Sequence, residues 1–310
     1  MKSLFRPSLL VTIAVLIVLA FVLPNSYTMD VAIRVALVAI AVIGLNLLMG
    51  FAGQISMGHA AFVAIGAYGS GIIGARLGWP PLVALVVAAI GSGLLAWLIA
   101  KPILRLKGHS LAMATLGLGI IVNIVLVNEV NWTGGPDGMS VVPFQVFGFT
   151  FAKLIHWYAL SATLLVVAIV LSLNLFESPG GRALRGLNGS EVAARVVGVN
   201  VGSFKVRAFV ASAVFTTVSG SLTGHYLGFI SPSMATFTTS VELVTMVVLG
   251  GMASTFGAVL GAAVLTVLPQ LLGGLNGYEA TLFGLILMLT MIFLPKGLVP
   301  SLALKLQRRK

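Results

Sequence analysis

The chain has 310 residues, of which 59% are hydrophobic and only 8% charged, against roughly 25% charged in ordinary globular domains. This composition excludes a soluble globular protein, whose surface would need many more charges. The 18 Lys and Arg residues against 7 Asp and Glu would suggest nucleic acid in a soluble protein. Here the cations lie between long apolar runs, which favours a role in membrane orientation and no nucleic-acid partner. No cysteine is present and the four histidines are scattered, so no metal site is expected.

Ten segments have the length and apolar character of membrane spans, which need about 20 mostly apolar residues. The segments are 8–23, 31–50, 60–75, 82–100, 111–127, 157–176, 208–226, 240–250, 256–272 and 281–294. The first run is followed by Leu23-Pro24-Asn25, with no small-residue cleavage site, so it is expected to be a retained helix. We predict an all-α polytopic membrane protein with a single transmembrane domain over residues 1–310.

The distribution of cations predicts the orientation. With a cytoplasmic N-terminus, ten spans place 1–7, 51–59, 101–110, 177–207, 251–255 and 295–310 on the inside. All Lys and Arg residues except Arg34, Arg76 and Lys153 fall in these segments. Because cytoplasmic loops carry an excess of Lys and Arg, both termini are expected in the cytoplasm.

A glycine-rich stretch, 50–58, joins two spans at the predicted cytoplasmic side. Gly53 and Gly58 permit tight backbone turns, and Gln54 and Ser56 add polar side chains. Ser56 is also expected to be the N-cap of the following helix. Two interpretations are open: a gate or path-lining turn, or close helix packing with a helix cap.

Two longer hydrophilic segments interrupt the apolar pattern. The outer one, 128–156, is rich in turn formers and aromatic residues, with nearly balanced charges. It is either a docking surface for an extracytoplasmic partner or an ordinary connection. The inner one, 177–207, contains cations and a short helical pattern and is the more informative.

Within the inner segment, 190–198 reads as one short helix. Ser190 is a good N-cap, Glu191 suits the positive N-terminal end, and Gly198 suits the left-handed position after the helix. A helix of two turns is unstable alone in water, so the rest of the chain or a partner must hold it. Two groups of side chains are available for such contacts. The apolar side of the helix consists of Val192, Ala193, Val196 and Val197, and the surrounding cations are Arg182, Arg185 and Arg195.

Charged residues inside spans are costly and usually face a cavity or a partner. Glu242 lies near the outer end of an apolar run and is expected to meet a substrate ammonium group or to pair with Arg34. Asp30 and Arg34, one helical turn apart, are expected to pair with each other. The short run 240–250 ends at Gly250 and Gly251, which suggests a broken or partly re-entrant element.

Several of these motifs resemble one family. The Ala193-Ala194-x-x-x-Gly198 core after Glu191 resembles the EAA loop of bacterial ABC importer permeases, although Val192 separates the glutamate from the alanine pair. The runs Gly50–Phe62, Val241–Met252, Gly257–Ala262 and Phe293–Leu298 resemble branched-chain amino-acid permeases of the LivM type.

The resemblance implies a type II ABC importer-like fold in a bacterial inner membrane. It also implies a LivH-type sister permease, two cytoplasmic ATPases, an extracytoplasmic substrate-binding protein and surrounding membrane lipid. Residues at the ATPase would be Arg182, Arg185, Glu191, Ala193, Ala194 and Gly198. Residues of the path or gate would be Gly53, Gln54, Ser56, Gly58, Glu242, Gly250 and Gly251. No G-x-x-x-x-G-K-[ST] loop is present, so no cofactor is expected on this chain and ATP–Mg would bind the partner ATPases.

Three alternatives remain at this stage. A permease of the same family could carry urea or amides in place of branched-chain amino acids. An ion-driven secondary transporter would use intramembrane acids near the midplane, whereas Glu242 lies near the edge of its span. An intramembrane enzyme would need a nucleophile and a base, such as Ser56 and His59.

Overall fold

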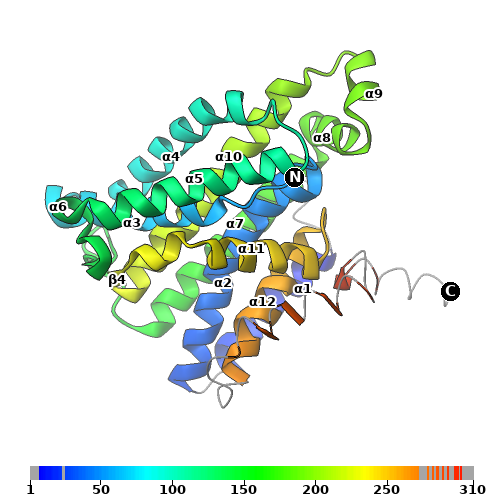
Figure 1. Cartoon of the computed structure of the whole chain (residues 1–310). Coiled ribbons are helices and arrows are strands. Elements are labelled where there is room, and N and C mark those ends of the chain that lie inside the picture. The colour runs from blue at the N-terminus through cyan, green and yellow to red at the C-terminus, as the bar shows by residue number, and fades with distance from the viewer. Residues whose placement is uncertain are drawn as a thin grey trace.

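The structure is a computed structural model that describes residues 7–22 and 25–271 and, beyond them, residues 278, 281–282, 284–285, 288–289, 292, 297–299 and 301. Over this part of the chain it is a bundle of helices with one pair of short helices projecting from an end (Figure 1). The expected span 281–294 lies largely outside the described residues.

The order of helices follows the predicted apolar runs. The long helices are α2 (Ser26–Asn46), which continues as the π-helix η2 (Leu47–Phe51), α3 (His59–Leu77), α4 (Pro81–Ile103), α5 (His109–Asn128), α7 (Leu154–Glu177) and α10 (Val201–Leu227). The shorter ones are α1 (Pro7–Val22), α6 (Val130–Thr133), α8 (Pro179–Gly189), α9 (Glu191–Val196), α11 (Phe237–Gly250) and α12 (Thr255–Leu271), with 3₁₀ turns η3 (Gly135–Asp137) and η4 (Pro232–Ala235).

Six helices of the described chain are long and apolar enough to cross a membrane: α2 with η2, α3, α4, α5, α7 and α10. This confirms an all-α polytopic membrane protein, but the predicted count of ten spans is not confirmed. Three of the expected spans, 8–23, 240–250 and 256–272, correspond to the shorter apolar helices α1, α11 and α12.

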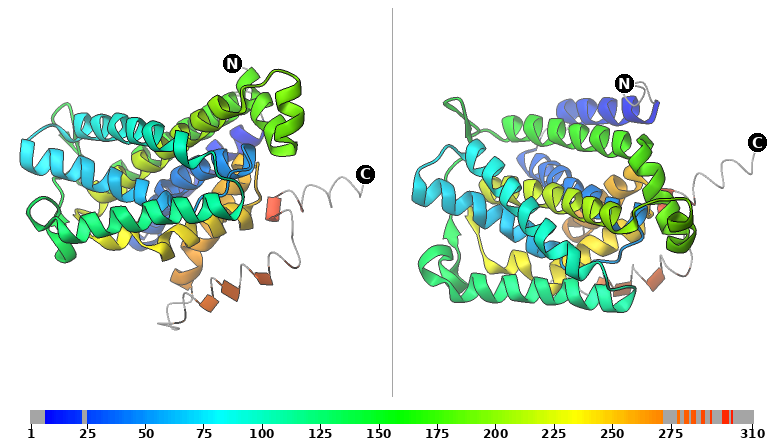
Figure 2. Two further views of the ribbon diagram at one scale, coloured as in Figure 1. Left: turned by 45° about the horizontal axis from the view of Figure 1, so that its top comes forward. Right: turned by 90° about the horizontal axis from the view of Figure 1, so that it is seen from above.

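Helix α10 forms the centre of the bundle. It packs against α2, α3 and α4, while α2 packs in turn against α7 and α12 (Figure 2). Glycines let α3 and α10 approach closely, because a Cβ atom at Gly66 would lie 2.0 Å from the Thr217 carbonyl oxygen, and one at Gly220 would lie 2.0 Å from that of Val63. Small residues at crossings are a general means of packing helices in membranes.

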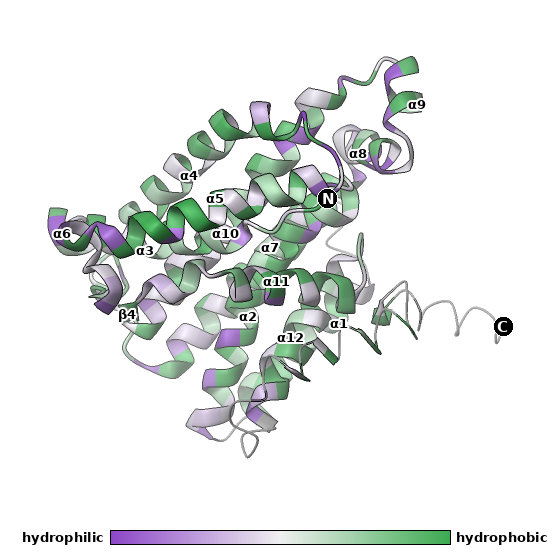
Figure 3. Cartoon of the chain, in the orientation of Figure 1, coloured by the Kyte–Doolittle hydropathy of each residue, from purple (hydrophilic) through white to green (hydrophobic). Residues whose placement is uncertain are grey.

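The two ends of the bundle differ in structure. At one end, β1 (Met139–Ser140) pairs antiparallel with β4 (Phe229–Ile230), and β2 (Gln145–Val146) forms a hairpin with β3 (Phe149–Thr150). At the opposite end, α8 and α9 project (Figure 1). Apolar side chains dominate α4 and α5 between these ends (Figure 3), as expected of helices that are little buried by the rest of the chain.

Candidate functional site

The loops predicted to be cytoplasmic meet at the end that bears α8 and α9. Asn188 Nδ2 donates to the Gly50 carbonyl at 2.7 Å, and Asn46 Nδ2 donates to the Ser254 carbonyl at 3.0 Å. Lys107 lies 3.8 Å from Glu191 Oε2. These contacts bring the end of α2 and η2, directly before segment 51–59, together with segments 101–110, 177–207 and 251–255.

Both predicted caps of the short helix α9 are confirmed. The Ser190 hydroxyl accepts a hydrogen bond from the Ala193 N–H at 3.2 Å. Gly198 has a φ of +83°. Its N–H bonds the Arg195 carbonyl, and the Val199 N–H bonds the Ala194 carbonyl, each at 3.0 Å. This pair of bonds is the Schellman motif, which satisfies carbonyls at the end of a helix.

The two sides of α9 have different environments. Ala194 is buried in a cluster with Leu184 and Leu187 of α8. On the other side Val192 is 72% exposed and Val196 is 83% exposed. The apolar side predicted from the sequence therefore faces away from the chain. An apolar surface of this kind on a two-turn helix suits contact with a partner.

Glu191 faces the bundle and fastens α9 to it. Its carboxylate bonds the ammonium of Lys205, which is almost fully buried, and lies within 4.0 Å of Lys107 and Arg195. Burial alone would raise the pKa of Glu191, but the Lys205 hydrogen bond and the three cations outweigh it and lower the pKa below its ordinary value of 4.5. From the sequence, Lys107 and Lys205 contribute only to the predicted orientation of the chain, because no regular spacing relates them to Glu191.

Arg182 and Arg185 lie on α8 and act within the chain. Arg182 donates to the Glu177 carbonyl at 3.0 Å, and Arg185 donates to the Phe176 carbonyl at 3.4 Å. The Arg185 guanidinium also lies 4.1 Å from the centre of the Phe176 ring. Cations that bind the last carbonyls of a helix stabilise its end. Both side chains therefore hold α8 against the end of α7 while remaining partly exposed.

The stretch 52–58 follows the π-helix η2 and runs into the bundle. Gly53 has a φ of +65° and lies against Asn188, since a Cβ atom there would be 2.6 Å from Asn188 Oδ1. At Gly58 a Cβ atom would be 2.1 Å from the Thr115 carbonyl oxygen. The Asn188 side chain of α8 thus packs against Gly53 and the Thr115 backbone of α5 against Gly58, and no larger residue fits at either position without displacing a neighbour.

Ser56 is not the N-cap that the sequence suggested. The helix begins at His59, with Gly58 in the cap position and no side-chain cap. The Ser56 hydroxyl instead bonds His59 Nδ1 at 2.8 Å, and His59 Nε2 bonds the Ser212 hydroxyl at 2.7 Å. All three groups are buried. The Ser56–His59 pair is close in sequence, whereas Ser212 reaches the histidine only because α3 and α10 pack together there, which no local pattern encodes.

The position of Ser212 on α10 shows how far stretch 52–58 extends into the helix bundle. Ser212 lies eleven residues after the start of α10, which is about 16 Å along a helix. Stretch 52–58 therefore ends well inside the bundle, a correction to the prediction that it stays at the cytoplasmic surface. Irregular backbone at such depth is tolerated where protein surrounds it or where it lines a cavity.

Gln54 has one amide atom without a partner inside this stretch. Its side chain is 6% exposed, and Nε2 donates to the Ala52 carbonyl at 3.1 Å. Its Oε1 has no hydrogen-bond partner among the described residues. Unpartnered buried oxygens are uncommon and costly, so a polar solute in a path here would find an acceptor at Gln54.

The remaining candidates lie on α11 and at its end. α11 stops at Gly250, and Asn46 holds the following turn by accepting from the Ala253 N–H at 3.0 Å. This places Gly250 and Gly251 beside η2. Glu242 is half-buried near the opposite end of α11. Arg34 pairs with Asp30 at 2.8 Å, as predicted. Ser240, two residues before Glu242, accepts a hydrogen bond from the Ala60 N–H at 3.3 Å, which brings this part of α11 next to the start of α3.

Comparison with known proteins identifies the family. Residues 27–295 match the family model described as the branched-chain amino acid transport system / permease component. The chain belongs to this family. It is therefore a membrane transport permease subunit and not an enzyme.

Individual relatives agree with this assignment. The chain is 33% identical over 297 residues to the high-affinity branched-chain amino acid transport system permease protein LivM of Escherichia coli K12, covering 88% of this chain and 70% of that protein. It is 34% identical over 302 residues to LivM of Salmonella typhimurium, with the same coverage. LivH of Escherichia coli K12 is 26% identical over 279 residues, covering 84% and 90%. No solved structure matches the chain significantly.

Proposed function

We propose that this permease forms half of the translocation path of a bacterial ABC importer for branched-chain or related apolar amino acids. It would pair with a LivH-type sister permease in a type II importer-like fold in the inner membrane. Two cytoplasmic ATPases would bind and hydrolyse ATP–Mg to drive transport, and a substrate-binding protein would deliver substrate outside. The substrate class is supported by the relatives, which include the branched-chain amino acid permease proteins LivM and LivH.

The observation that supports the coupling role is the construction of α9. It is capped at both ends, fastened by Glu191 and Ala194, and exposes Val192 and Val196 outward. Five cations lie on or beside α8 and α9, which favours the cytoplasmic side for this end: Lys107, Arg182, Arg185, Arg195 and Lys205. The distribution of Lys and Arg along the sequence favours the same side for both termini. A helix that is attached to the bundle and exposes an apolar side can contact a partner and transmit the partner's movement to the bundle.

Hydrogen bonds offer a route from α9 into the bundle. α9 follows α8 directly, and Asn188 of α8 bonds the Gly50 carbonyl at the end of η2. Asn46, one turn earlier on α2, holds the turn between α11 and α12 through Ala253 and Ser254. A movement of α8 would thus reach stretch 52–58 and the α11–α12 turn together. A π-helix at this point is consistent with a segment that adjusts.

The outer loop offers a surface for the binding protein. Phe147 is fully exposed at the tip of the β2–β3 hairpin and has a φ of +49°, which is unusual for an aromatic residue. Phe149 beside it is 52% exposed. Exposed aromatic side chains are typical centres of protein interfaces. We therefore assign the docking of the binding protein to this hairpin.

Reconstitution tests the proposal. The chain should be purified with its partners, placed in liposomes, and assayed for uptake of leucine, urea and a small amide with and without internal or external ATP and binding protein. Leucine uptake that needs ATP and all partners is expected. Urea or amide uptake would change the substrate class. Uptake by this chain alone on an ion gradient, without nucleotide, would contradict the proposal.

A further inference from the structure

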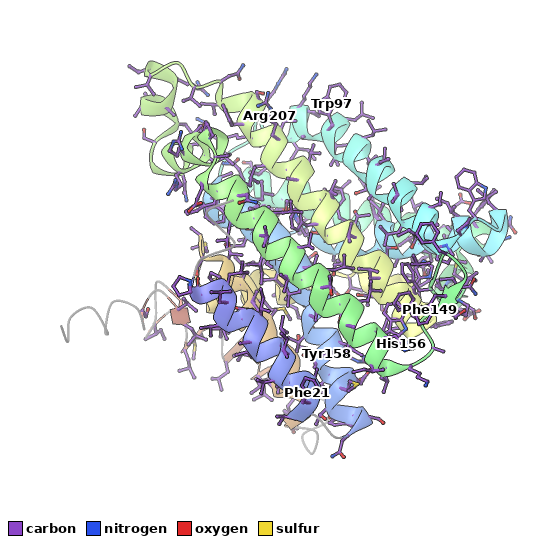
Figure 4. The ribbon with its side chains drawn as sticks, turned by 180° about the vertical axis from the view of Figure 1, so that it is seen from behind. Phe21, Trp97, Phe149, His156, Tyr158 and Arg207 are labelled. Carbon is purple, nitrogen blue, oxygen red and sulfur yellow. The ribbon has the colours of Figure 1, made fainter. Side chains whose placement is uncertain are left out.

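A cavity of about 780 Å³ opens between α4 and α10, next to the coupling end. Figure 4 shows two of its lining residues, Trp97 of α4 and Arg207 of α10, on neighbouring helices. The residues that line the cavity are Trp97, Lys101, Leu104, Arg105, Asn200, Gly202, Ser203, Val206, Arg207, Val210 and Ala211. No residue of stretch 52–58 is among them, so the cavity is separate from the proposed path.

The charge of this cavity has a single sign. Lys101, Arg105 and Arg207 line it, and no carboxylate does. The Lys101 ammonium lies 4.4 Å from the centre of the Trp97 ring. The first turn of α10 forms part of the wall, and the N-terminal end of a helix carries partial positive charge. Any occupant must therefore be anionic at this end.

The rest of the cavity is apolar. Val206, Val210, Ala211 and Leu104 supply its floor, and Trp97 closes one side. A small soluble anion would satisfy the cations but leave this floor exposed. A tryptophan beside cations is typical of the headgroup level of a membrane, and α4 is the least buried of the six membrane-capable helices. An occupant with an anionic head and an apolar tail fits both halves.

We propose that this cavity binds an anionic glycerophospholipid. Arg105, Arg207 and Lys101 hold its phosphodiester, and one acyl chain lies on Val206 and Val210 between α4 and α10. Basic pockets between transmembrane helices on the cytoplasmic side are suited to such headgroups. The lipid belongs to the cytoplasmic leaflet, which rests on the orientation proposed above.

The site lies close to the coupling helix. Asn200 lines the cavity and caps α10, accepting from the Ser203 N–H at 3.1 Å, and it follows α9 in the chain by four residues. Lys107, four residues after the end of α4, contacts Glu191 of α9. A lipid that bridges α4 and α10 therefore steadies both supports of α9. Coupling of ATP hydrolysis to uptake is expected to depend on anionic lipid.

The test uses the assembled transporter in detergent. Native mass spectrometry measures retention of phosphatidylglycerol, of phosphatidylcholine as the uncharged-head comparison, and of sn-glycerol 3-phosphate as the headgroup without acyl chains. The double variant Arg105→Gln/Arg207→Gln removes two lining cations. The matched control Arg76→Gln/Lys153→Gln removes two cations that lie outside the cavity.

We expect the wild type and the control variant to retain phosphatidylglycerol selectively. In the Arg105/Arg207 variant this retention should be weakened roughly tenfold or more. Equal retention by the two double variants would overturn the proposal. So would equally tight binding of glycerol phosphate, or no retained lipid because a partner subunit covers the cavity. Because retention is read by mass and without transport, this result is independent of whether the chain imports amino acids.

Discussion

Helix α9 and stretch 52–58 are the two candidate functional regions, and they differ in how they are stabilised. α9 has its own caps, Ser190 and Gly198, is joined to the bundle by the ion pairs of Glu191, and leaves an apolar side exposed. Stretch 52–58 has no regular structure and is held by groups far away in the sequence, such as Thr115 and Ser212. The first is built to be contacted from outside, whereas the second depends on the packing of the whole bundle. Substitutions on α9 should therefore impair transport, whereas substitutions in stretch 52–58 should impair folding.

The largest effect is expected at Gly58. A Cβ atom there would be 2.1 Å from the Thr115 carbonyl, whereas at Gly198 no atom lies within 4 Å. Gly58→Ala should abolish recovery of folded permease. Gly198→Ala strains a φ of +83° by about 1 kcal/mol and should leave the protein folded. Recovery of monodisperse protein by size-exclusion chromatography measures both.

Gly198→Pro should impair transport without impairing folding. Proline cannot adopt a positive φ and removes the N–H that bonds the Arg195 carbonyl. The permease should insert normally but lose coupling, so that ATP hydrolysis continues without uptake. Normal uptake by this variant would refute the coupling assignment.

A substitution on the exposed side of α9 should be nearly as severe for transport and harmless for folding. Val196→Asp places a charge on a surface that is 83% exposed in this chain but buried against the proposed ATPase. We expect uptake to fall by about tenfold or more with unchanged thermal stability. Val196→Thr, which keeps the shape, is the matched control. If Val196→Asp transported normally, α9 would not be the contact.

His59 tests whether the buried hydrogen bonds hold stretch 52–58. His59→Ala leaves the Ser56 and Ser212 hydroxyls without their partner, and Ser212→Ala removes one bond. Each should lower the free energy of unfolding by about 1–2 kcal/mol. The double variant should cost less than the sum because the two residues share one interaction. Additive losses in a double-mutant cycle would show that the pair does not interact.

Glu191 gives a pH-dependent effect, the smallest of the series. Because its folded-state pKa lies below the ordinary value of 4.5, its ion pairs add stability above that pH and lose it as pH falls through the folded-state pKa. Glu191→Gln should therefore be less thermostable than wild type at neutral pH. The difference should shrink as the pH falls below about 4.5. A difference independent of pH would indicate that the charge of Glu191 is not involved.

Local patterns in the sequence predicted α9 and the grouping of loops at one end. The capping residues Ser190 and Gly198 are read from neighbours in the chain, and the loops follow from the order of apolar runs. The number of membrane spans could not be predicted in the same way, because length and hydropathy do not decide whether α1, α11 and α12 cross a membrane. The depth of stretch 52–58 and the partners of Glu191 were also missed. They depend on Ser212, Thr115 and Lys205, whose proximity exists only after the bundle has packed.

Site-specific cross-linking tests the central claim most directly. The chain has no cysteine, so Val196→Cys gives a single thiol on α9, and Phe147→Cys gives a single thiol at the other end. In the assembled transporter, a short thiol-to-amine cross-linker should join the Val196→Cys chain to an ATPase subunit, and ATP should change the yield. The Phe147→Cys chain should give no such product. Failure of Val196→Cys to reach an ATPase, with the complex intact, would contradict the account.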